Sequence, residues 1–338
     1  MNPIRPVLAA FEAEIGDLTE RMGRRVAVSD LGVTSRKGHL DLDPPGDRIS
    51  CNRACRMVRA ADGWMALNLA RPEDRDLVPA WLGRNGADDA WEAVETHLPG
   101  LACAELVERA ALLGLPAAAV GEVRCDTVAA PLLRLGRPER RERTPRVIDL
   151  SALWAGPMCG AVLAAMGWTI SKVESVHRPD PTREVTPEFA RRLNGRKMHL
   201  TFDFTEAAGR ARLRSLVEAA DVLITGARPR AFAGLGLDPE AVFAANPGLV
   251  WVAVTGYGWA GEASGRVAFG DDAAAAGGLV GWEGEAPHFL GDALADPVTG
   301  LAAAAGALRA LEQGGGMLAD VPLARTAAGA AAQLGLAA

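Results

Sequence analysis

The chain has 338 residues, of which 49% are apolar and 23% charged, a composition typical of a globular protein with a substantial core. Its net charge of −6 lacks the basic excess of nucleic-acid-binding proteins, so we expect no nucleic-acid partner. The five cysteines have neither disulfide nor metal-ligand spacing, which predicts no metal and a reduced compartment.

The apolar stretches of the chain do not indicate a membrane protein. The first 18 residues contain glutamates and an aspartate within their apolar run, unlike a signal peptide. The Ala-rich tracts near the C-terminus are interrupted by Arg309, Glu312 and Arg325 and are too short to span a bilayer. We therefore expect no membrane partner and a cytoplasmic location.

The first part of the chain predicts two units. Residues 1–49 comprise a helix over 4–22, where apolar residues recur with a helical period, and a polar, turn-rich segment. Residues 50–125 predict a small α+β domain, in which Asp62-Gly63 marks a hairpin-type turn. Its expected elements are a short one at 54–61, a strand at 64–69, helices at 73–84, 86–97 and 103–113, and a strand at 115–120.

The pattern changes after residues 126–145, a segment of prolines and arginines that we interpret as a linker. In residues 146–338 strands alternate with helices, which predicts a doubly wound, parallel, Rossmann-like α/β sheet. Ligands bind such sheets at the carboxyl ends of the strands. The strands are expected at 146–150, 169–173, 198–202, 221–224 and 249–255, and the helices at 158–166, 206–220, 239–245 and from about 296 to 311.

One loop of this domain matches a dinucleotide-binding pattern. Gly256, Gly258 and Gly261 follow a predicted strand with the spacing G-x-G-x-x-G. That fingerprint should open a helix, but no helix-forming run begins before Ala273, so we expect no NAD. The glycines still permit close approach of the backbone to another nucleotide-bearing cofactor.

Asp296 stands directly before Pro297 and an Ala-rich run from Leu301 to Leu311. Aspartate is a good N-cap and proline suits the first helical position, so Asp296 is expected to cap a helix. A carboxylate at a helix N-terminus beside Gly-rich loops is also a candidate nucleophile toward acyl groups. The local sequence leaves both interpretations open.

Residues 147–325 contain several short segments in a characteristic order. They are Val147–Ser151, Ala155–Pro157, Lys172–Glu174, Asp180–Arg183, Leu193–Asn194 with Lys197, Ala220–Ile224, Arg228–Pro229, Asn246–Pro247, Thr255–Gly258, Gly277–Leu279 and Ala295–Gly300. In these segments the chain resembles the family III CoA-transferases, which include formyl-CoA transferase and the related alpha-methylacyl-CoA racemases. The small domain resembles the family's second domain.

The resemblance implies an unusual domain order. In the family the small domain follows the α/β domain, whereas here it precedes it, so the chain looks circularly permuted with its junction at 126–145. Permutation is tolerated at exposed segments. The family's dimers are interlocked rings, so the resemblance implies a homodimer, in which the relocated linker could alter how the chains thread.

The resemblance also places Asp296 on the family's catalytic aspartate. The implied reaction moves CoA from an acyl-CoA donor to a carboxylic acid through an aspartyl anhydride and an aspartyl-CoA thioester. Coenzyme A and acyl-CoA are then substrates, and the partners are small molecules. The racemase branch pairs the aspartate with a histidine, whose matching position here is Phe269. A phenyl ring cannot exchange a proton, which favours transfer, although Asp271, Asp272 or His288 could substitute.

Several positions are implied as cofactor contacts or departures from the family pattern. Arg228 and Lys197 are cations that could meet the CoA phosphates, and Trp154 stands where a polar side chain can line the site. The changed positions keep open a third hypothesis, a partner subunit that binds acyl-CoA without turnover. The expected cofactor-binding residues are Trp154, Asn194, Lys197, Arg228, Gly256, Gly258 and Phe269.

Overall fold

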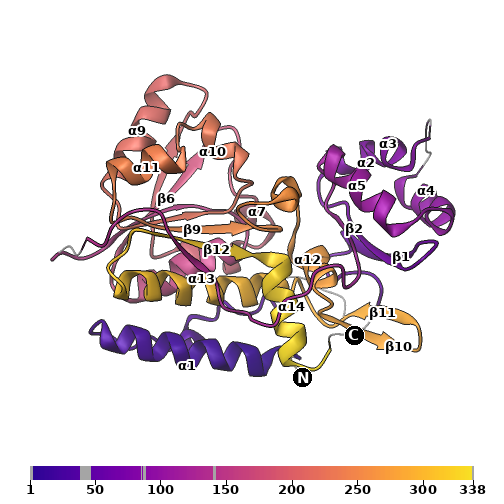
Figure 1. Ribbon diagram of the computed structural model, residues 1–338, viewed down its shortest axis with the longest axis horizontal. Coiled ribbons are helices and arrows are strands. Elements are labelled where there is room, and N and C mark those ends of the chain that lie inside the picture. The colour runs from indigo at the N-terminus through magenta and orange to yellow at the C-terminus, as the bar shows by residue number, and fades with distance from the viewer. Residues whose placement is uncertain (1–2, 39–46, 85, 87–88, 140–141, 337–338) are drawn as a thin grey trace.

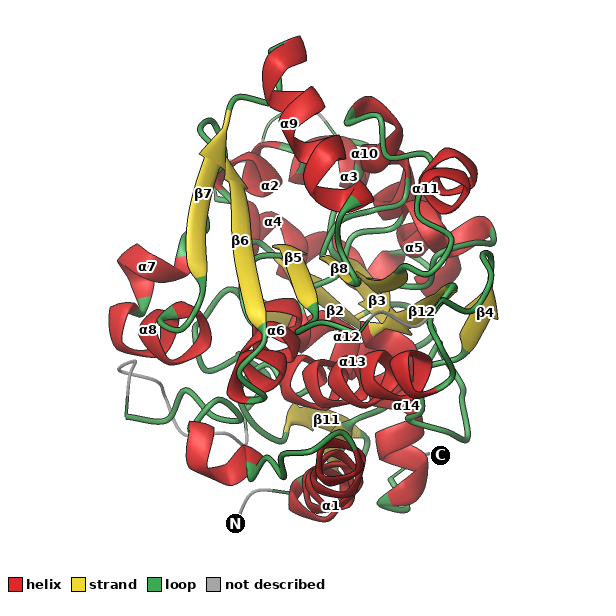
Figure 2. Ribbon diagram, turned by 90° about the vertical axis from the view of Figure 1, so that its left-hand side faces the viewer, coloured by secondary structure: helices red, strands yellow, loops and turns green. Residues whose placement is uncertain are grey.

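The computed structural model describes residues 3–38, 47–84, 86, 89–139 and 142–336. In this part of the chain the largest sheet has seven strands in the order β4-β12-β9-β8-β5-β6-β7 (Figures 1 and 2). All neighbouring pairs are parallel except β4 with β12. The strands are β4 Leu132–Arg134, β5 Arg146–Leu150, β6 Thr169–Ser175, β7 Met198–Phe202, β8 Val222–Thr225, β9 Val250–Thr255 and β12 Met317–Pro322.

Helices cover both faces of this sheet, which confirms the predicted doubly wound α/β architecture. In Figure 1 the helices α9, α10 and α11 lie above the sheet and the long helix α13 lies below it. The central strands β8, β9 and β12 are buried along their whole length, as expected for parallel strands covered on both sides. The upper helices are α9 Ala207–Glu218, α10 Arg230–Gly234 and α11 Pro239–Ala245; the lower ones are α6 Ala155–Ala165, α13 Ala295–Glu312 and α14 Leu323–Gln333.

The N-terminal helix α1 (Arg5–Arg21) adds a further layer beneath α13 (Figure 1). Its apolar face, which includes Phe11 and Ile15, belongs to the same buried cluster as α13 and α6. At its end the Nε of Arg21 lies 2.7 Å from a carboxylate oxygen of Glu312. The predicted first helix is therefore confirmed, and it packs on the large sheet's helical layer.

The small unit has its own sheet and core. Strands β1 (Cys55–Arg59), β2 (Trp64–Asn68) and β3 (Ala117–Ala119) pair antiparallel, with Arg59 opposite Trp64 across the predicted turn. Trp81, Leu67 and Leu106 are buried within its apolar cluster. Its helices are α2 Pro72–Asp76, α3 Val78–Leu82, α4 Ala90–His97 and α5 Cys103–Leu113.

Several elements differ from the prediction. The helix expected at 73–84 is divided into α2 and α3, and the start of the one expected at 86–97 includes residues outside the described part. The segment 126–145 contains β4, which adds an antiparallel edge strand to the large sheet. The elements α10, β12 and α14 were not predicted. The remaining elements, also not predicted as such, are α7 Thr182–Val185, α8 Pro187–Asn194, α12 Gly270–Ala276, β10 Val280–Glu283, β11 Ala286–Phe289 and short 3-10 helices at Val28–Leu31, Leu98–Gly100 and Glu262–Gly265. The division into units at 1–49, 50–125, 126–145 and 146–338 stays a prediction.

Candidate active site

Asp296 is the second residue of α13, which begins at Ala295. Leu294 occupies the N-cap position without a side-chain capping bond, so the prediction that Asp296 caps this helix is wrong. Four residues separate the end of the helix from the start of β12, and the helix is about 27 Å long. Its first turn therefore lies at the carboxyl ends of the parallel strands, where α/β proteins bind ligands.

The Asp296 carboxylate is closely packed but not sealed. It accepts a hydrogen bond from the backbone amide of Ala155, the first residue of α6. On the opposite helix Gly270 leaves room for it: a Cβ atom at residue 270 would lie 2.1 Å from Oδ2 of Asp296. The residue is half-buried, in contrast to its buried neighbours Ala295 and Pro297.

Arg36 comes from the N-terminal segment and enters the same site. Its Nε and Nη2 atoms donate to the two carboxylate oxygens of Asp292, at 2.8 and 2.5 Å. Its guanidinium carbon lies 4.9 Å from the ring centroid of Trp154. The Trp154 ring is fixed in turn by a 2.8 Å hydrogen bond from Nε1 to the carbonyl of Val33 and by an edge-on contact with Phe189. The sequence-predicted Trp154 thus lies at the site, whereas Arg36 and Asp292 were missed.

Two further carboxyl groups stand at the start of α12. Asp271 accepts from the backbone amide of Ala293 at 2.8 Å. Asp272 accepts from the amide of Phe269 at 3.1 Å and from Nδ2 of Asn68, in the small unit, at 3.0 Å. Both residues are almost completely buried. The end of β2 therefore contacts the helix that borders Asp296.

The carboxyl groups hold their protons unusually well. Burial raises the pKa of Asp296 to about 7; Arg36 opposes the increase and Asp292 adds to it. Burial and the neighbouring Asp292 likewise raise the pKa of Asp271 to about 7, and burial raises that of Asp272 to about 8. Raised pKa values are characteristic of functional sites, because they place the ionisation near the working pH.

Cys51 is a nearby thiol, but it is a poor competitor for the nucleophilic role. Burial, followed by the charges of Asp292 and Asp271, raises its pKa to about 11. The thiolate, which is the reactive form of cysteine, is then scarce at neutral pH. Among the residues that the structure describes, no group of three His, Cys, Asp or Glu side chains is arranged to hold a metal.

Arg228 lies in a group of positive charges that we call the arginine cluster: Arg71, Arg178, Arg228 and Arg230. Burial lowers the pKa of Arg228, and the other three arginines lower it further. The guanidinium of Arg71 lies 5.8 Å from the ring of Phe269, which directly precedes the glycine packed on Asp296. Arg71 is therefore near both Arg228 and Phe269, and Phe269 adjoins the glycine that packs on Asp296.

Lys197 and Asn194 have a different environment. The Nζ of Lys197 is completely buried and donates to Asp149 at 2.7 Å, to the carbonyl of Pro157 at 2.8 Å and to Oδ1 of Asn194 at 2.8 Å. These three partners use the three ammonium hydrogens. This geometry does not support the predicted contact between Lys197 and a CoA phosphate. The buried ammonium group instead links α6 to β5.

Gly256 and Gly258 form the turn after β9. A Cβ at Gly256 would lie 3.1 Å from Ala268, while Gly258 has a φ of +122° and donates its amide to Oγ1 of Thr255 at 2.9 Å. The loop leads into the 3-10 helix Glu262–Gly265 rather than an α-helix of the kind that opens a dinucleotide site. The glycines bring the loop close to the segment before Phe269.

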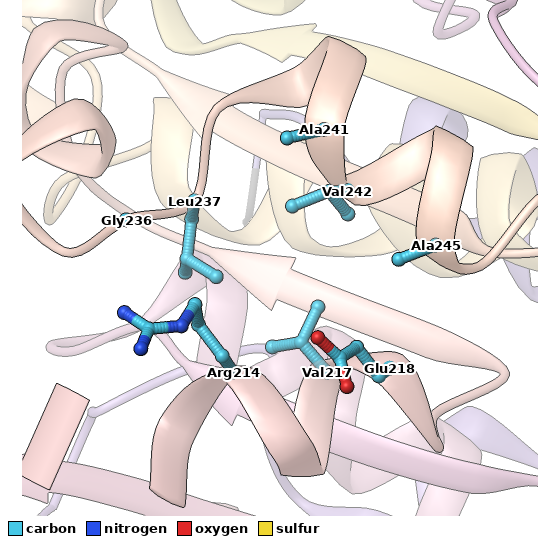
Figure 3. A pocket seen from close by; sticks show the side chains of 8 residues that line it. All are labelled: Arg214, Val217, Glu218, Gly236, Leu237, Ala241, Val242 and Ala245. Carbon is cyan, nitrogen blue, oxygen red and sulfur yellow. The ribbon is translucent and has the colours of Figure 1, made fainter. Parts of the chain in front are cut away.

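The remaining features are a histidine, a glycine-rich turn and a pocket. His288 is in β11, with its ring packed where a side chain at Gly281 would stand. Gly314 to Gly316 follow the far end of α13 and all have positive φ values, so they form the turn into β12. A pocket lies between α9 and α11 (Figure 3), which are on the other side of the sheet from α13 (Figure 1). Its lining residues are Arg214, Val217, Glu218, Gly236, Leu237, Ala241, Val242 and Ala245.

The fold and site define an α/β protein that presents a half-buried carboxylate at the ligand-binding edge of a parallel sheet. The model of the CoA-transferase family III matches residues 144–336, more than half of the chain. The chain therefore belongs to the CoA-transferase family III. In the described part of the chain, moreover, no helix combines the length and hydropathy needed to cross a bilayer.

Three relatives illustrate the similarity. The chain is 33% identical over 202 residues to succinyl-CoA–D-citramalate CoA-transferase of Chloroflexus aurantiacus, covering 55% of this chain and 50% of that protein. It is 34% identical over 116 residues to alpha-methylacyl-CoA racemase of Homo sapiens, covering 34% and 28%. The crystal structure of a CAIB/BAIF family protein from Brucella suis matches with a TM-score of 0.51 and 29% identity, covering 58% and 56%. The chain thus spans about half the length of the transferase and of the solved structure.

Proposed function

We propose that this protein transfers CoA from an acyl-CoA donor to a carboxylic acid, with Asp296 as the nucleophile. The observation that carries the proposal is the position of Asp296: the residue is half-buried, at the carboxyl edge of the sheet, and its carboxylate accepts the amide of Ala155. Family membership supports the reaction class. Relatives named for succinyl-CoA make that thioester the first donor to test.

The reaction proceeds by covalent relay. An Asp296 oxygen attacks the acyl carbon of the donor, the C–S bond breaks, and a mixed anhydride and CoA thiolate form. The thiolate attacks the Asp296 carbonyl, which releases the donor acid and leaves an aspartyl-CoA thioester. A carboxylate of the acceptor acid attacks that thioester, and the returning thiolate takes the acceptor's acyl group and restores Asp296. Each step forms one bond and breaks one bond, which divides a difficult exchange into easier ones.

The surroundings supply the roles that this relay needs. The amide of Ala155 fixes one carboxylate oxygen of Asp296, and Trp154 and Phe269 provide apolar surface that limits hydrolysis. The arginine cluster supplies positive charge for the CoA phosphates, with Arg228 in the role expected from the family. CoA would extend from the arginine cluster past Phe269 to Asp296.

Racemisation is the second candidate function, because the chain is similar to the human alpha-methylacyl-CoA racemase. Returning an α-proton to either face requires two bases, and Phe269 occupies the position of the racemase histidine. Asp271, whose pKa is raised to about 7, is the carboxyl group that could take that place. A non-catalytic partner subunit is the third hypothesis. The homodimer, its interlocking, the permuted domain order and the cytoplasmic location likewise belong to the proposal.

The test is covalent capture of Asp296. The protein is incubated with succinyl-CoA, and with other acyl-CoAs in parallel, then treated with hydroxylamine, and the peptide containing Asp296 is analysed by mass spectrometry. A hydroxamate on Asp296, absent in Asp296→Asn, supports transfer. Deuterium incorporation at the α-carbon without Asp296 modification supports racemisation, and binding of acyl-CoA with neither product supports a partner subunit.

A further inference from the structure

Arg36 belongs to the group of charged side chains around Asp296. Two of its nitrogens donate to Asp292, and the guanidinium lies over the Trp154 ring. The Arg36 and Asp292 side chains remain 18% and 14% exposed, so the pair can be reached from solvent. In the part of the chain that the structure describes, no acceptor is recorded for Nη1, the third nitrogen of the guanidinium.

The charge around Arg36 is unbalanced. Asp271, Asp292 and Asp296 all interact electrostatically with this one guanidinium. A carboxylic acid substrate that approaches the Asp296 thioester brings another negative charge, which Asp271 and Asp292 would repel. A guanidinium group binds a carboxylate through two parallel N–H bonds, and Asp292 already occupies one such edge of Arg36.

We propose that Arg36 binds a carboxylate of the acid substrate and that Asp292 holds the guanidinium in place while competing for it. This inference rests on the proposed function and adds a specificity-determining residue from the N-terminal segment. The bound group is either the carboxylate that attacks the Asp296 thioester or a second, unreactive carboxylate of a dicarboxylic acid. Both make the same guanidinium–carboxylate contact.

Competition between Asp292 and the substrate for Arg36 predicts that the Arg36 and Asp292 variants change the KM for the acid in opposite directions. Replacing Arg36 by Gln removes the cation, so the KM for the acid should rise about tenfold to a hundredfold, the range expected for losing a charged hydrogen bond. Replacing Asp292 by Asn keeps Arg36 and removes its competitor, so that KM should fall. If the pair were only structural, both variants would change KM in the same direction.

The experiment measures discharge of the Asp296–CoA thioester by propionate and by succinate, after labelling with an acyl-CoA that modifies the wild-type protein. Arg21→Gln is the matched control, because Arg21 also pairs with an acid but at an exposed site on α1. In Arg36→Gln, a KM increase for both acids identifies the attacking carboxylate as the group that Arg36 binds. A KM increase for succinate alone identifies the distal carboxylate of the dicarboxylic acid. Either result supports the proposal.

The proposal is overturned by an unchanged acid KM in Arg36→Gln, by a raised acid KM in Asp292→Asn, or by failure of both acids to discharge the wild-type thioester. Labelling of Asp296 by the acyl-CoA is measured separately in each variant. Absence of labelling in the wild-type protein would instead refute the proposed function, so the two failures are distinguishable.

Discussion

At the scale of single residues, the ionisation of Asp296 should control the first chemical step. Burial raises its pKa to about 7, although Arg36 opposes this. Only the carboxylate attacks an acyl carbon, so labelling of Asp296 by acyl-CoA should accelerate as pH rises and level off above about 7. The measurement is the initial labelling rate between pH 5 and pH 9, with the protein's fold checked by circular dichroism at each pH.

The neighbouring charges provide the control for this assignment. Asp292→Asn removes a negative charge that raises the Asp296 pKa, so its rate profile should shift to lower pH. Arg36→Gln removes a positive charge that lowers the pKa, so its profile should shift to higher pH. A profile that neither variant displaces would mean that another group controls the step.

Asp296 could be predicted from the sequence because it lies in a recognisable local segment, Ala295–Gly300. Arg36 could not, because its hydrogen bonds to Asp292 join residues 256 positions apart and its own segment carries no motif. Lys197 shows the opposite limitation. Its charge suggested a phosphate contact, but the burial that determines its actual partners is a property of the folded chain.

At the scale of elements, the site depends on close contact between the first turns of α12 and α13. A Cβ at Gly270 would lie 2.1 Å from Oδ2 of Asp296 and 2.7 Å from the Cβ of Ala293. Gly270→Ala should therefore displace the carboxylate and cost about 1–3 kcal/mol of unfolding free energy, as overpacking usually does. We expect slower labelling of Asp296, measured together with urea unfolding.

Gly234→Ala is the matched control, because it also adds a methyl group within a helix. Nothing lies within 4 Å of a Cβ at Gly234 in α10. Alanine favours the helix there, so stability should be unchanged or higher by up to about 1 kcal/mol, with normal labelling. Equal labelling by both variants would show that the contact at Gly270 does not position Asp296.

Some of the elements that the sequence predicted have regular patterns. The β-branched run of β9 and the Ala-rich run of α13 are examples. By contrast, β12 is interrupted by Asp320 and ends at Pro322, yet it lies inside the sheet between β4 and β9. Its pairing comes from tertiary contacts, which local propensity does not contain. The same reason explains why β4, only three residues long, was interpreted as linker.

At the scale of the whole molecule, the site joins three distant parts of the chain. Arg36 comes from the N-terminal segment, Asn68 from the small unit and Asp296 from the large sheet's helical layer. A further contact between the small and large units is the ion pair of Glu122 with Arg266, at 2.5 Å. The site therefore requires the N-terminal segment and the small unit to keep their positions against the large sheet's helical layer. Their order along the sequence does not affect this requirement.

Variants of the buried Lys197–Asp149 pair test how much this ion pair contributes to the stability of the fold. Burial would raise the pKa of Asp149, but Lys197 and Lys172 outweigh it and lower the pKa to about 2. Lys197→Met should leave a charged carboxylate without its ion-pair partner and lower the unfolding free energy by about 3–5 kcal/mol. Adding Asp149→Asn should recover part of the loss, since the uncompensated charge is then removed. Urea unfolding of the single and double variants measures both effects.

The exposed pair Arg191–Glu188 supplies the comparison, because both side chains are more than half exposed. Arg191→Gln should change the unfolding free energy by less than about 1 kcal/mol.

The KM for acyl-CoA distinguishes the two roles considered for Lys197. A large loss of stability with an unchanged KM in the folded protein fits the buried ion pair. Normal stability with a raised KM would return Lys197 to the CoA phosphates, and would require its side chain to leave the position it occupies between Asp149 and Asn194.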